Sequence, residues 1–123
     1  MEITLKLKED KKYLEMIRIL SNLKNPEIKP FNQLRNREME VYAVLLYLYN
    51  ERYSTTPKED RDALVFSYDS RQEIAERLGD ISKDTIYNIM MDLRKKGLID
   101  KKNLKSSFIL PNNNFIKLNF NGK

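Results

Sequence analysis

Apolar residues recur every three or four positions in several segments of the chain, which predicts amphipathic helices. These helices are expected over residues 9–24, 36–52, 70–79 and 82–97. The second is the strongest, because the stretch 39–49 leaves almost no polar face in its middle. A helix that is apolar nearly all round is buried on several sides, so we expect it to form the core against which the other helices pack.

Strict alternation of apolar and polar residues predicts a half-buried strand over residues 1–8. The alternating run at 115–120 offers this strand a partner, because its apolar residues form a matching row. Further short strands are expected where brief apolar runs lie between polar stretches, at 63–66, 98–99 and 107–110. The pattern as a whole predicts an α+β fold with a helical core and a small sheet.

Two prolines interrupt the pattern between the first and second helices. Asn25-Pro26 is expected to stop the first helix, and Lys29-Pro30 to keep the following chain extended. Residues 25–33 are therefore expected to be a linker. With the strand and helix before it, this linker makes an N-terminal appendage of residues 1–33, and residues 34–123 form the main domain.

Residues 70–97 carry the start and stop signals of two helices joined by a tight turn. Ser70 is expected to cap the first helix in a capping box with Glu73, and Gly79 to supply the backbone freedom that ends it. Ser82 is expected to cap the second helix. Two such helices form a helix-turn-helix, a motif in which the second helix is the candidate reader of DNA.

The absence of cysteine and histidine narrows the chemistry that this chain can carry out. Disulfides and thiolate metal sites are excluded, and the commonest general base is missing. The acids show no spacing that suggests a catalytic pair, and three glycines do not form a glycine-rich phosphate loop. We therefore expect no enzyme, no metal and no cofactor. No signal peptide and no apolar run of membrane length is visible, so the expected location is the cytoplasm, without a membrane partner.

The formal net charge of +5 is concentrated in the C-terminal part of the chain. Residues 1–70 hold 12 Lys and Arg and 12 Asp and Glu, whereas residues 71–123 hold 11 and 6. A basic field over the helix-turn-helix and the segment that follows it is typical of a surface that binds nucleic acid. The alternative interpretation is a solvated lysine-rich tail.

The order of elements over residues 36–120 resembles that of the winged helix-turn-helix superfamily. The most specific part is RQEIAERLGDISKDTIYNIMMDLRKKGLI, residues 71–99. The residues that fall on the family's small, turn and core positions are Ala75, Gly79, Ile81, Ile86 and Ile89. Asp80 lengthens the turn by one residue, which is common in winged members. Within the superfamily, the chain looks like small regulators and replication initiators of phages and plasmids.

This resemblance implies a helical core with a small antiparallel sheet, or wing. It also implies sequence-specific binding of double-stranded DNA and a role in transcription regulation, with helix 82–96 in the major groove and wing 101–107 on phosphate. The candidate DNA-binding residues are Arg71, Gln72, Ser82, Lys83, Thr85, Tyr87, Asn88, Arg94, Lys95, Lys101, Lys102 and Lys105. Asn can pair with adenine and Lys can reach guanine acceptors, while wing lysines neutralise phosphates without reading sequence.

Other interpretations stay open, because exposed polar residues on a helix are often mere solvent contacts. Asp84 and Met91 are expected on the reading face, where a strong DNA reader would have Arg or Gln. The chain is alternatively a replication initiator or accessory DNA-binding protein, or a winged-helix module that binds a host or transcription-machinery protein. A dimeric metabolite sensor is the remaining alternative.

A homodimer is a separate hypothesis, which rests on the tyrosines of the strongest helix. Tyrosine tolerates a half-wet contact, so a subunit interface there is credible. The candidate interface residues are Tyr42, Tyr47 and Tyr49. The alternative is that these tyrosines belong to the core of the single chain.

Overall fold

The computed structural model describes residues 2–5, 9–101, 103–110 and 117–120. This part of the chain is mostly helical and carries a small antiparallel hairpin, which is compatible with the expected α+β class. The helices are α1 (Glu9–Ser21), α2 (Lys29–Asn32), α3 (Asn36–Tyr47), α4 (Lys58–Val65), α5 (Tyr68–Leu78) and α6 (Lys83–Lys95). The strands are β1 (Glu2–Leu5), β2 (Ile99–Asp100), β3 (Asn103–Leu104) and β4 (Lys117–Phe120).

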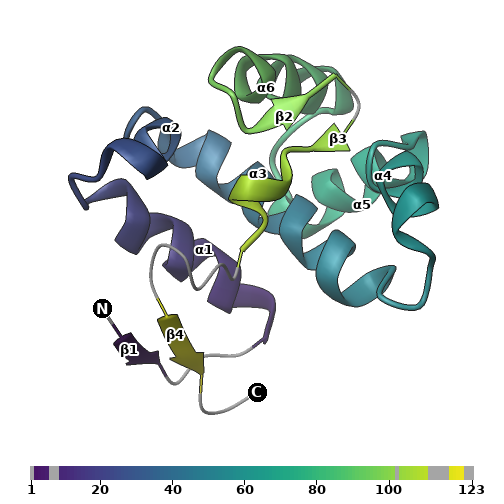
Figure 1. Cartoon of the computed structure of the whole chain (residues 1–123). Helices are drawn as coiled ribbons and strands as arrows, with labels where there is room; N and C mark the ends of the chain where they lie inside the picture. The colour runs from purple at the N-terminus through teal and green to yellow at the C-terminus, as the bar shows by residue number, and fades with distance from the viewer. Residues whose placement is uncertain (1, 6–8, 102, 111–116, 121–123) are drawn as a thin grey trace.

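Helix α3 lies at the centre of the molecule, where it packs against α1, α5 and α6 (Figure 1). Its side chains Val41, Leu45 and Leu46 have no exposed surface. A π-helical turn, Leu48–Arg52, continues α3, so the predicted helix does end at residue 52. The prediction that this helix is buried on several sides is confirmed, because most of its apolar residues are buried.

The predicted linker at residues 25–33 is wrong, because this stretch is packed rather than extended. It forms a short 3-10 turn, Pro26–Ile28, and then α2, and both Ile28 and Phe31 are fully buried. Each proline lies in the first turn of its helical segment, where the missing N–H costs nothing. The hydrophobic core is therefore continuous from α1 through this stretch to α3.

Two local predictions around the start of α5 are wrong. The expected strand at 63–66 lies at the end of α4, whose first turn is stabilised by Glu59 and Asp60 near the positive end of the helix dipole. Helix α5 also begins earlier than expected, because Ser67 caps it by accepting a hydrogen bond from the Ser70 backbone. Ser70 itself is buried, and its hydroxyl donates to the carbonyl of Leu64.

Strands β2 and β3 form an antiparallel hairpin, with Ile99 opposite Leu104, so its second strand comes earlier in the chain than the one expected at 107–110. The strand expected at 107–110 is wrong, since a 3-10 turn, Ser106–Phe108, leads the chain back to the core. Tyr42 donates to the carbonyl of Phe108 at 2.6 Å, and Asn50 donates to that of Leu110 at 2.7 Å. These two side-chain hydrogen bonds satisfy carbonyls that a strand would have paired along its edge.

The predicted pairing between the two ends of the chain is confirmed for the backbone. Strand β1 pairs in parallel with β4, with Ile3 opposite Leu118 and Leu5 opposite Phe120. The remaining residues of the two predicted strands, 1, 6–8 and 115–116, lie outside the described residues.

A buried carboxylate joins the start of α3 to the end of α6. Glu38 is 1% exposed and accepts hydrogen bonds from the backbone of Arg35, at 2.8 Å, and from the ammonium of Lys96. Lys96 also donates to the carbonyl of Gln33 at 2.9 Å. Burial alone would raise the pKa of the Glu38 carboxyl, but its hydrogen bonds and the charge of Lys96 hold this pKa below the usual value.

Replacing Glu38 by glutamine is expected to lower the free energy of unfolding by about 1–3 kcal/mol near neutral pH. Because the native pKa is lowered, the carboxylate stabilises the fold above its unfolded pKa, and this contribution is lost as pH falls through the native pKa. Urea unfolding from about pH 7 to pH 3 should therefore show a flatter acid limb in the variant. Glu40→Gln on the same helix is the control, since Glu40 is only half-buried. Equal acid limbs for both variants would contradict the assignment.

Candidate nucleic-acid interface

Helices α5 and α6 are joined by the tight turn that the sequence predicts. Gly79 ends α5 with a φ of 85°, a conformation that a residue with a side chain rarely adopts. Ser82 caps α6, and its hydroxyl oxygen accepts a hydrogen bond from the Thr85 backbone at 3.1 Å. Both predicted signals are confirmed, so the sequence itself determines where α6 begins.

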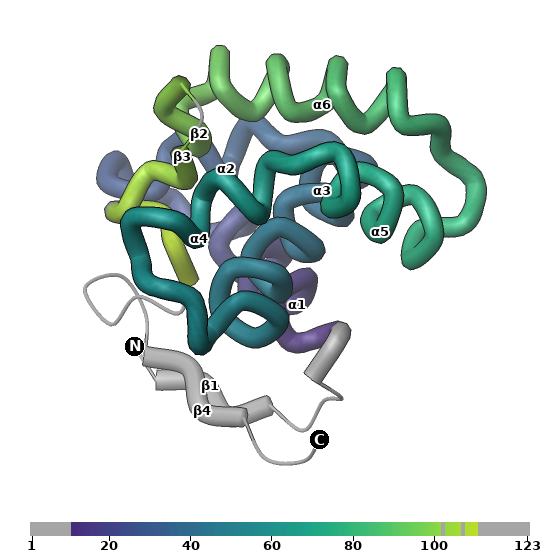
Figure 2. The backbone as a smooth tube through the Cα atoms, turned by 90° about the vertical axis from the view of Figure 1, so that its right-hand side faces the viewer, coloured from purple at the N-terminus to yellow at the C-terminus, as the bar shows by residue number. Residues whose placement is uncertain are grey.

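Helix α6 has the two faces that its sequence predicts. The buried face consists of Ile86, Ile89, Met90 and Leu93, which pack against the core. The opposite face is exposed to solvent and contains Asp84, Thr85, Tyr87, Asn88 and Met91. In Figure 2, α6 runs along the top edge of the molecule, with the hairpin at one end and the turn from α5 at the other.

The structure brings the candidate DNA-binding residues to the start of α5, the outer face of α6 and the hairpin. Those that are exposed are Gln72, Ser82, Thr85, Tyr87, Asn88, Arg94, Lys95, Lys101 and Lys105. Arg71 and Lys83 are half-buried, and Lys102 lies outside the described residues. Lys101 stands at the hairpin tip in a left-handed conformation, with a φ of 58°.

Three acids of the two-helix unit are paired with arginines from elsewhere in the chain. Asp80 binds Arg37 at 2.7 Å, and Asp92 lies 3.4 Å from Arg35. Glu73 likewise binds Arg52, at 2.6 Å. Exposed ion pairs of this kind add little to stability, but they cancel negative charge where a nucleic acid would approach.

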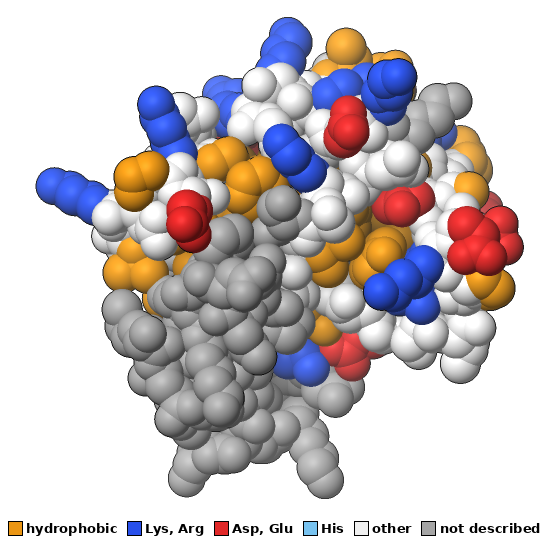
Figure 3. All heavy atoms as spheres, viewed as in Figure 1, with side chains coloured by type: hydrophobic (Ala, Val, Ile, Leu, Met, Phe, Trp, Pro, Cys, Tyr) orange, Lys and Arg blue, Asp and Glu red, His pale blue; other side chains and the backbone are white. Residues whose placement is uncertain are grey.

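Six cations of the two-helix unit and the hairpin have no acidic partner among the described residues, whereas Arg77 pairs with Glu73 and Lys96 with Glu38. Among the described residues, no carboxylate pairs with Arg71, Lys83, Arg94, Lys95, Lys101 or Lys105. Figure 3 shows Lys and Arg side chains along the upper rim of the molecule, interrupted by an acidic side chain, and more acids on the right. The unpaired cations therefore make a positive rim over α6 and the hairpin.

Tyr68 is a candidate contact residue that the sequence analysis missed. Its side chain is 56% exposed, and the ammonium of Lys83 lies 4.2 Å from the centre of its ring. The guanidinium of Arg71 lies 5.9 Å from the same ring, and Lys83 donates to the tyrosine hydroxyl. Tyr68 was missed because α5 was expected to begin at Ser70, which would have left this tyrosine outside the helix.

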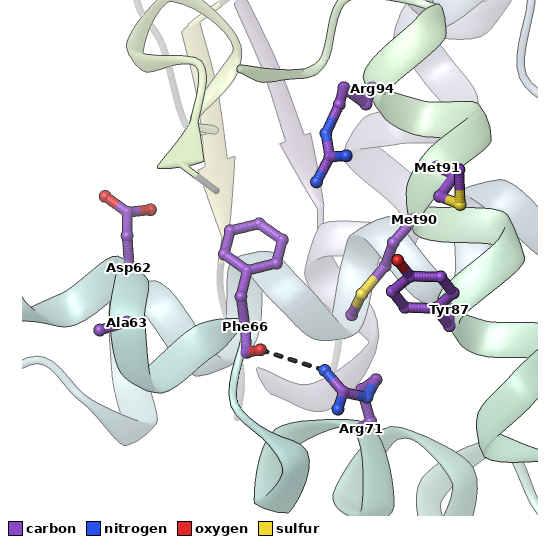
Figure 4. Close-up of a pocket in the computed structure, with 8 residues that line it drawn as sticks. All are labelled: Asp62, Ala63, Phe66, Arg71, Tyr87, Met90, Met91 and Arg94. Carbon is purple, nitrogen blue, oxygen red and sulfur yellow. Dashed lines mark hydrogen bonds between the residues drawn. The ribbon is translucent and has the colours of Figure 1, made fainter. Parts of the chain in front are cut away.

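A cleft lies between α4, the start of α5 and the flank of α6, and its volume is about 530 Å³. The side chains that line it are Asp62, Ala63, Phe66, Arg71, Tyr87, Met90, Met91 and Arg94 (Figure 4). At the edge of the cleft, Asp62 accepts a hydrogen bond from the Leu104 backbone at 2.9 Å, which ties the hairpin to α4. Arg71 donates to the carbonyl of Phe66 at 3.2 Å, which holds its guanidinium over the cleft.

Two of the three tyrosines of the dimer hypothesis are buried within the chain. Tyr42 has no exposed surface, and burial raises the pKa of its hydroxyl. That hydroxyl donates a hydrogen bond to the carbonyl of Phe108. Tyr49 is also buried, with the guanidinium of Arg61 lying 4.9 Å from its ring centre. Tyr47 is half-buried beneath Arg77. The core accounts for Tyr42 and Tyr49, and the homodimer stays a hypothesis.

The described residues hold no group of three acidic side chains that could bind a metal ion. Within the same part of the chain, none of the helices has the length and apolarity needed to cross a membrane. Comparison with known proteins gives no match to a family model, a curated protein or a solved structure.

Proposed function

We propose that this chain binds double-stranded DNA as a winged helix-turn-helix protein and acts as a transcriptional regulator. Helix α6 lies in the major groove, and the hairpin segment 101–107, the wing, lies on phosphate. The observation that carries this proposal is the positive rim. Three acids of the two-helix unit are paired with arginines from α3 and its flanks, while the six cations of the rim have no acidic partner among the described residues. Such a surface attracts phosphate most strongly where α6 is exposed.

The exposed face of α6 supplies the groups that read base edges. The amide of Asn88 pairs with adenine through one donor and one acceptor, and the methyl group of Thr85 meets the methyl group of thymine. Lys83 stands above the ring of Tyr68 at the start of the helix, where it reaches either a phosphate or guanine. These contacts place the N-terminal half of α6 deepest in the groove.

Fluorescence anisotropy on a mixture of labelled duplexes, at several salt concentrations, tests the proposal directly. Affinity should fall steeply with salt, with a slope of about 0.9 for each phosphate contact. Absence of binding even at low salt would refute it. Selection of bound sequences from a random duplex library would then separate a promoter-binding regulator, which selects a single operator, from a replication initiator, which selects a repeated origin element.

Replacing Asn88 by alanine is expected to relax sequence preference at one base pair by about 1–3 kcal/mol. The change should appear as a loss of adenine at a single position in the library selection, with other positions retained. Lys101→Ala is the matched control, because a residue that contacts phosphate should weaken all sequences alike. An Asn88 variant that loses affinity equally for all sequences would show that its amide does not read a base.

A further inference from the structure

The cleft beside α6 combines two guanidinium groups with an apolar wall. Arg71 reaches it from α5 and Arg94 from α6, while Phe66, Met90 and Met91 supply apolar surface (Figure 4). Arg94 forms no ion pair with any described residue, and Arg71 donates one hydrogen bond to the carbonyl of Phe66. Several N–H donors of both groups are therefore left for an anion.

The charges of the cleft also determine how an occupant would lie. The carboxylate of Asp62 faces the α4 side, and it is held there by the Leu104 backbone. An anionic group is repelled by Asp62 and attracted by the two arginines, which bind carboxylate and phosphate in a bidentate manner. The anionic end of an occupant is therefore directed toward Arg71 and Arg94, and its other end toward Phe66 and Ala63.

The size and wall of the cleft exclude a bare phosphate as the matching ligand. A volume of about 530 Å³ lies within the range of sites for small organic molecules, roughly 300–1,000 Å³. Inorganic phosphate would leave the rings of Phe66 and Tyr87 and the thioethers of both methionines without a contact. An occupant that satisfies both halves of the cleft carries one anionic group on an aromatic or aliphatic body.

We propose that this cleft binds a small organic anion, an aromatic or aliphatic body with one carboxylate or phosphate, and that such a ligand competes with DNA. The competition follows because Arg71, Tyr87 and Arg94 belong both to the cleft and to the candidate DNA-binding residues. This second part of the inference rests on the proposed function, whereas occupation of the cleft does not. The ligand is thus an effector that releases the protein from its site.

Occupation of the cleft is tested with anilinonaphthalene sulfonate, an aromatic anion whose fluorescence rises in apolar sites. Arg94→Gln should weaken binding of this probe about tenfold, and Met91→Gln about fivefold. Lys58→Gln is the matched control, because it removes one positive charge from an exposed position on α4 that does not line the cleft. Circular dichroism establishes that each variant is folded. Equal binding by the Arg94 and Lys58 variants would overturn the inference.

Two competitors isolate the contribution of the apolar wall. Phenyl phosphate should displace the probe at least about tenfold more effectively than inorganic phosphate, because only the former has a body for Phe66 and the methionines. Equal displacement by both would show that the cleft is a phosphate site and would overturn the proposal.

The link to DNA is tested separately with a labelled duplex. Phenyl phosphate at about ten times its dissociation constant should weaken duplex binding about tenfold, compared with inorganic phosphate at matched ionic strength. Unchanged duplex binding with the cleft filled would refute the competition and leave DNA binding intact. A chain that binds the probe but no duplex would instead refute the proposed function and leave the cleft as a ligand site.

Discussion

Replacing Phe31 by alanine is expected to lower the free energy of unfolding of the whole chain by about 3–5 kcal/mol. Phe31 has no exposed surface, and its ring meets the edges of Tyr42 and Phe108, with ring centres 6.1 and 5.6 Å apart. These rings come from α2, α3 and the turn after the hairpin. Truncation therefore opens a cavity where three distant parts of the chain meet.

Urea unfolding followed by circular dichroism measures this loss, and it should remain a single transition with an unchanged slope. Phe31→Leu serves as the milder variant, with a loss of about 1–2 kcal/mol, so the effect remains measurable if the alanine variant does not fold. A second transition, or an unchanged midpoint, would contradict the continuous core and show that residues 1–33 form a separate unit.

Long, strongly periodic segments were predictable from the sequence because their apolar spacing allows one packed arrangement. The buried position of α3 and the two faces of α6 follow from residues only three or four positions apart. The cap at Ser82 and the end of α5 at Gly79 were predictable for the same reason, since both depend on local backbone geometry. Each of these features is decided within a single helix.

Several of the wrong predictions concern residues whose role is decided by distant parts of the chain. The sequence around Pro26 and Pro30 is compatible with both a linker and short helices, and burial of Phe31 against α3 selects the helices. The hydroxyl of Tyr42 suggested a half-wet interface, but its partner, the carbonyl of Phe108, lies 66 positions away. Such a partner is not visible in any local pattern.

The electrostatics of the candidate interface likewise depend on residues that are far apart in the sequence. Residues 1–70 carry no net charge, which suggested that this part contributes little to the electrostatic field. In the structure, Arg37 and Arg52 from this part bind Asp80 and Glu73 of the two-helix unit. The first part of the chain therefore strengthens the positive rim by cancelling acids, an effect that a sum over the sequence does not reveal.

The second large effect is expected when three cations of the rim are removed together. The triple variant Lys83→Gln, Lys95→Gln and Lys101→Gln should lose three phosphate contacts and lower the salt slope by about 2.7. Because this electrostatic contribution vanishes near about 1 M salt, affinity for any duplex should fall about 500-fold at 0.1 M and only about tenfold at 0.4 M. Anisotropy titrations of wild type and variant at both salt concentrations measure the two ratios.

A control with the same change in net charge separates position from total charge. Lys11, Lys24 and Lys58 are exposed, they form no ion pair with any described residue, and they lie outside α5, α6 and the hairpin. Their triple glutamine variant should bind duplex within about threefold of wild type, because none of the three belongs to the positive rim and salt screens exposed charges that do not contact phosphate. Equal losses in both triple variants would mean that the chain attracts DNA only through its net charge. Loss confined to the rim variant would establish α6 and the hairpin as the surface that holds the phosphates.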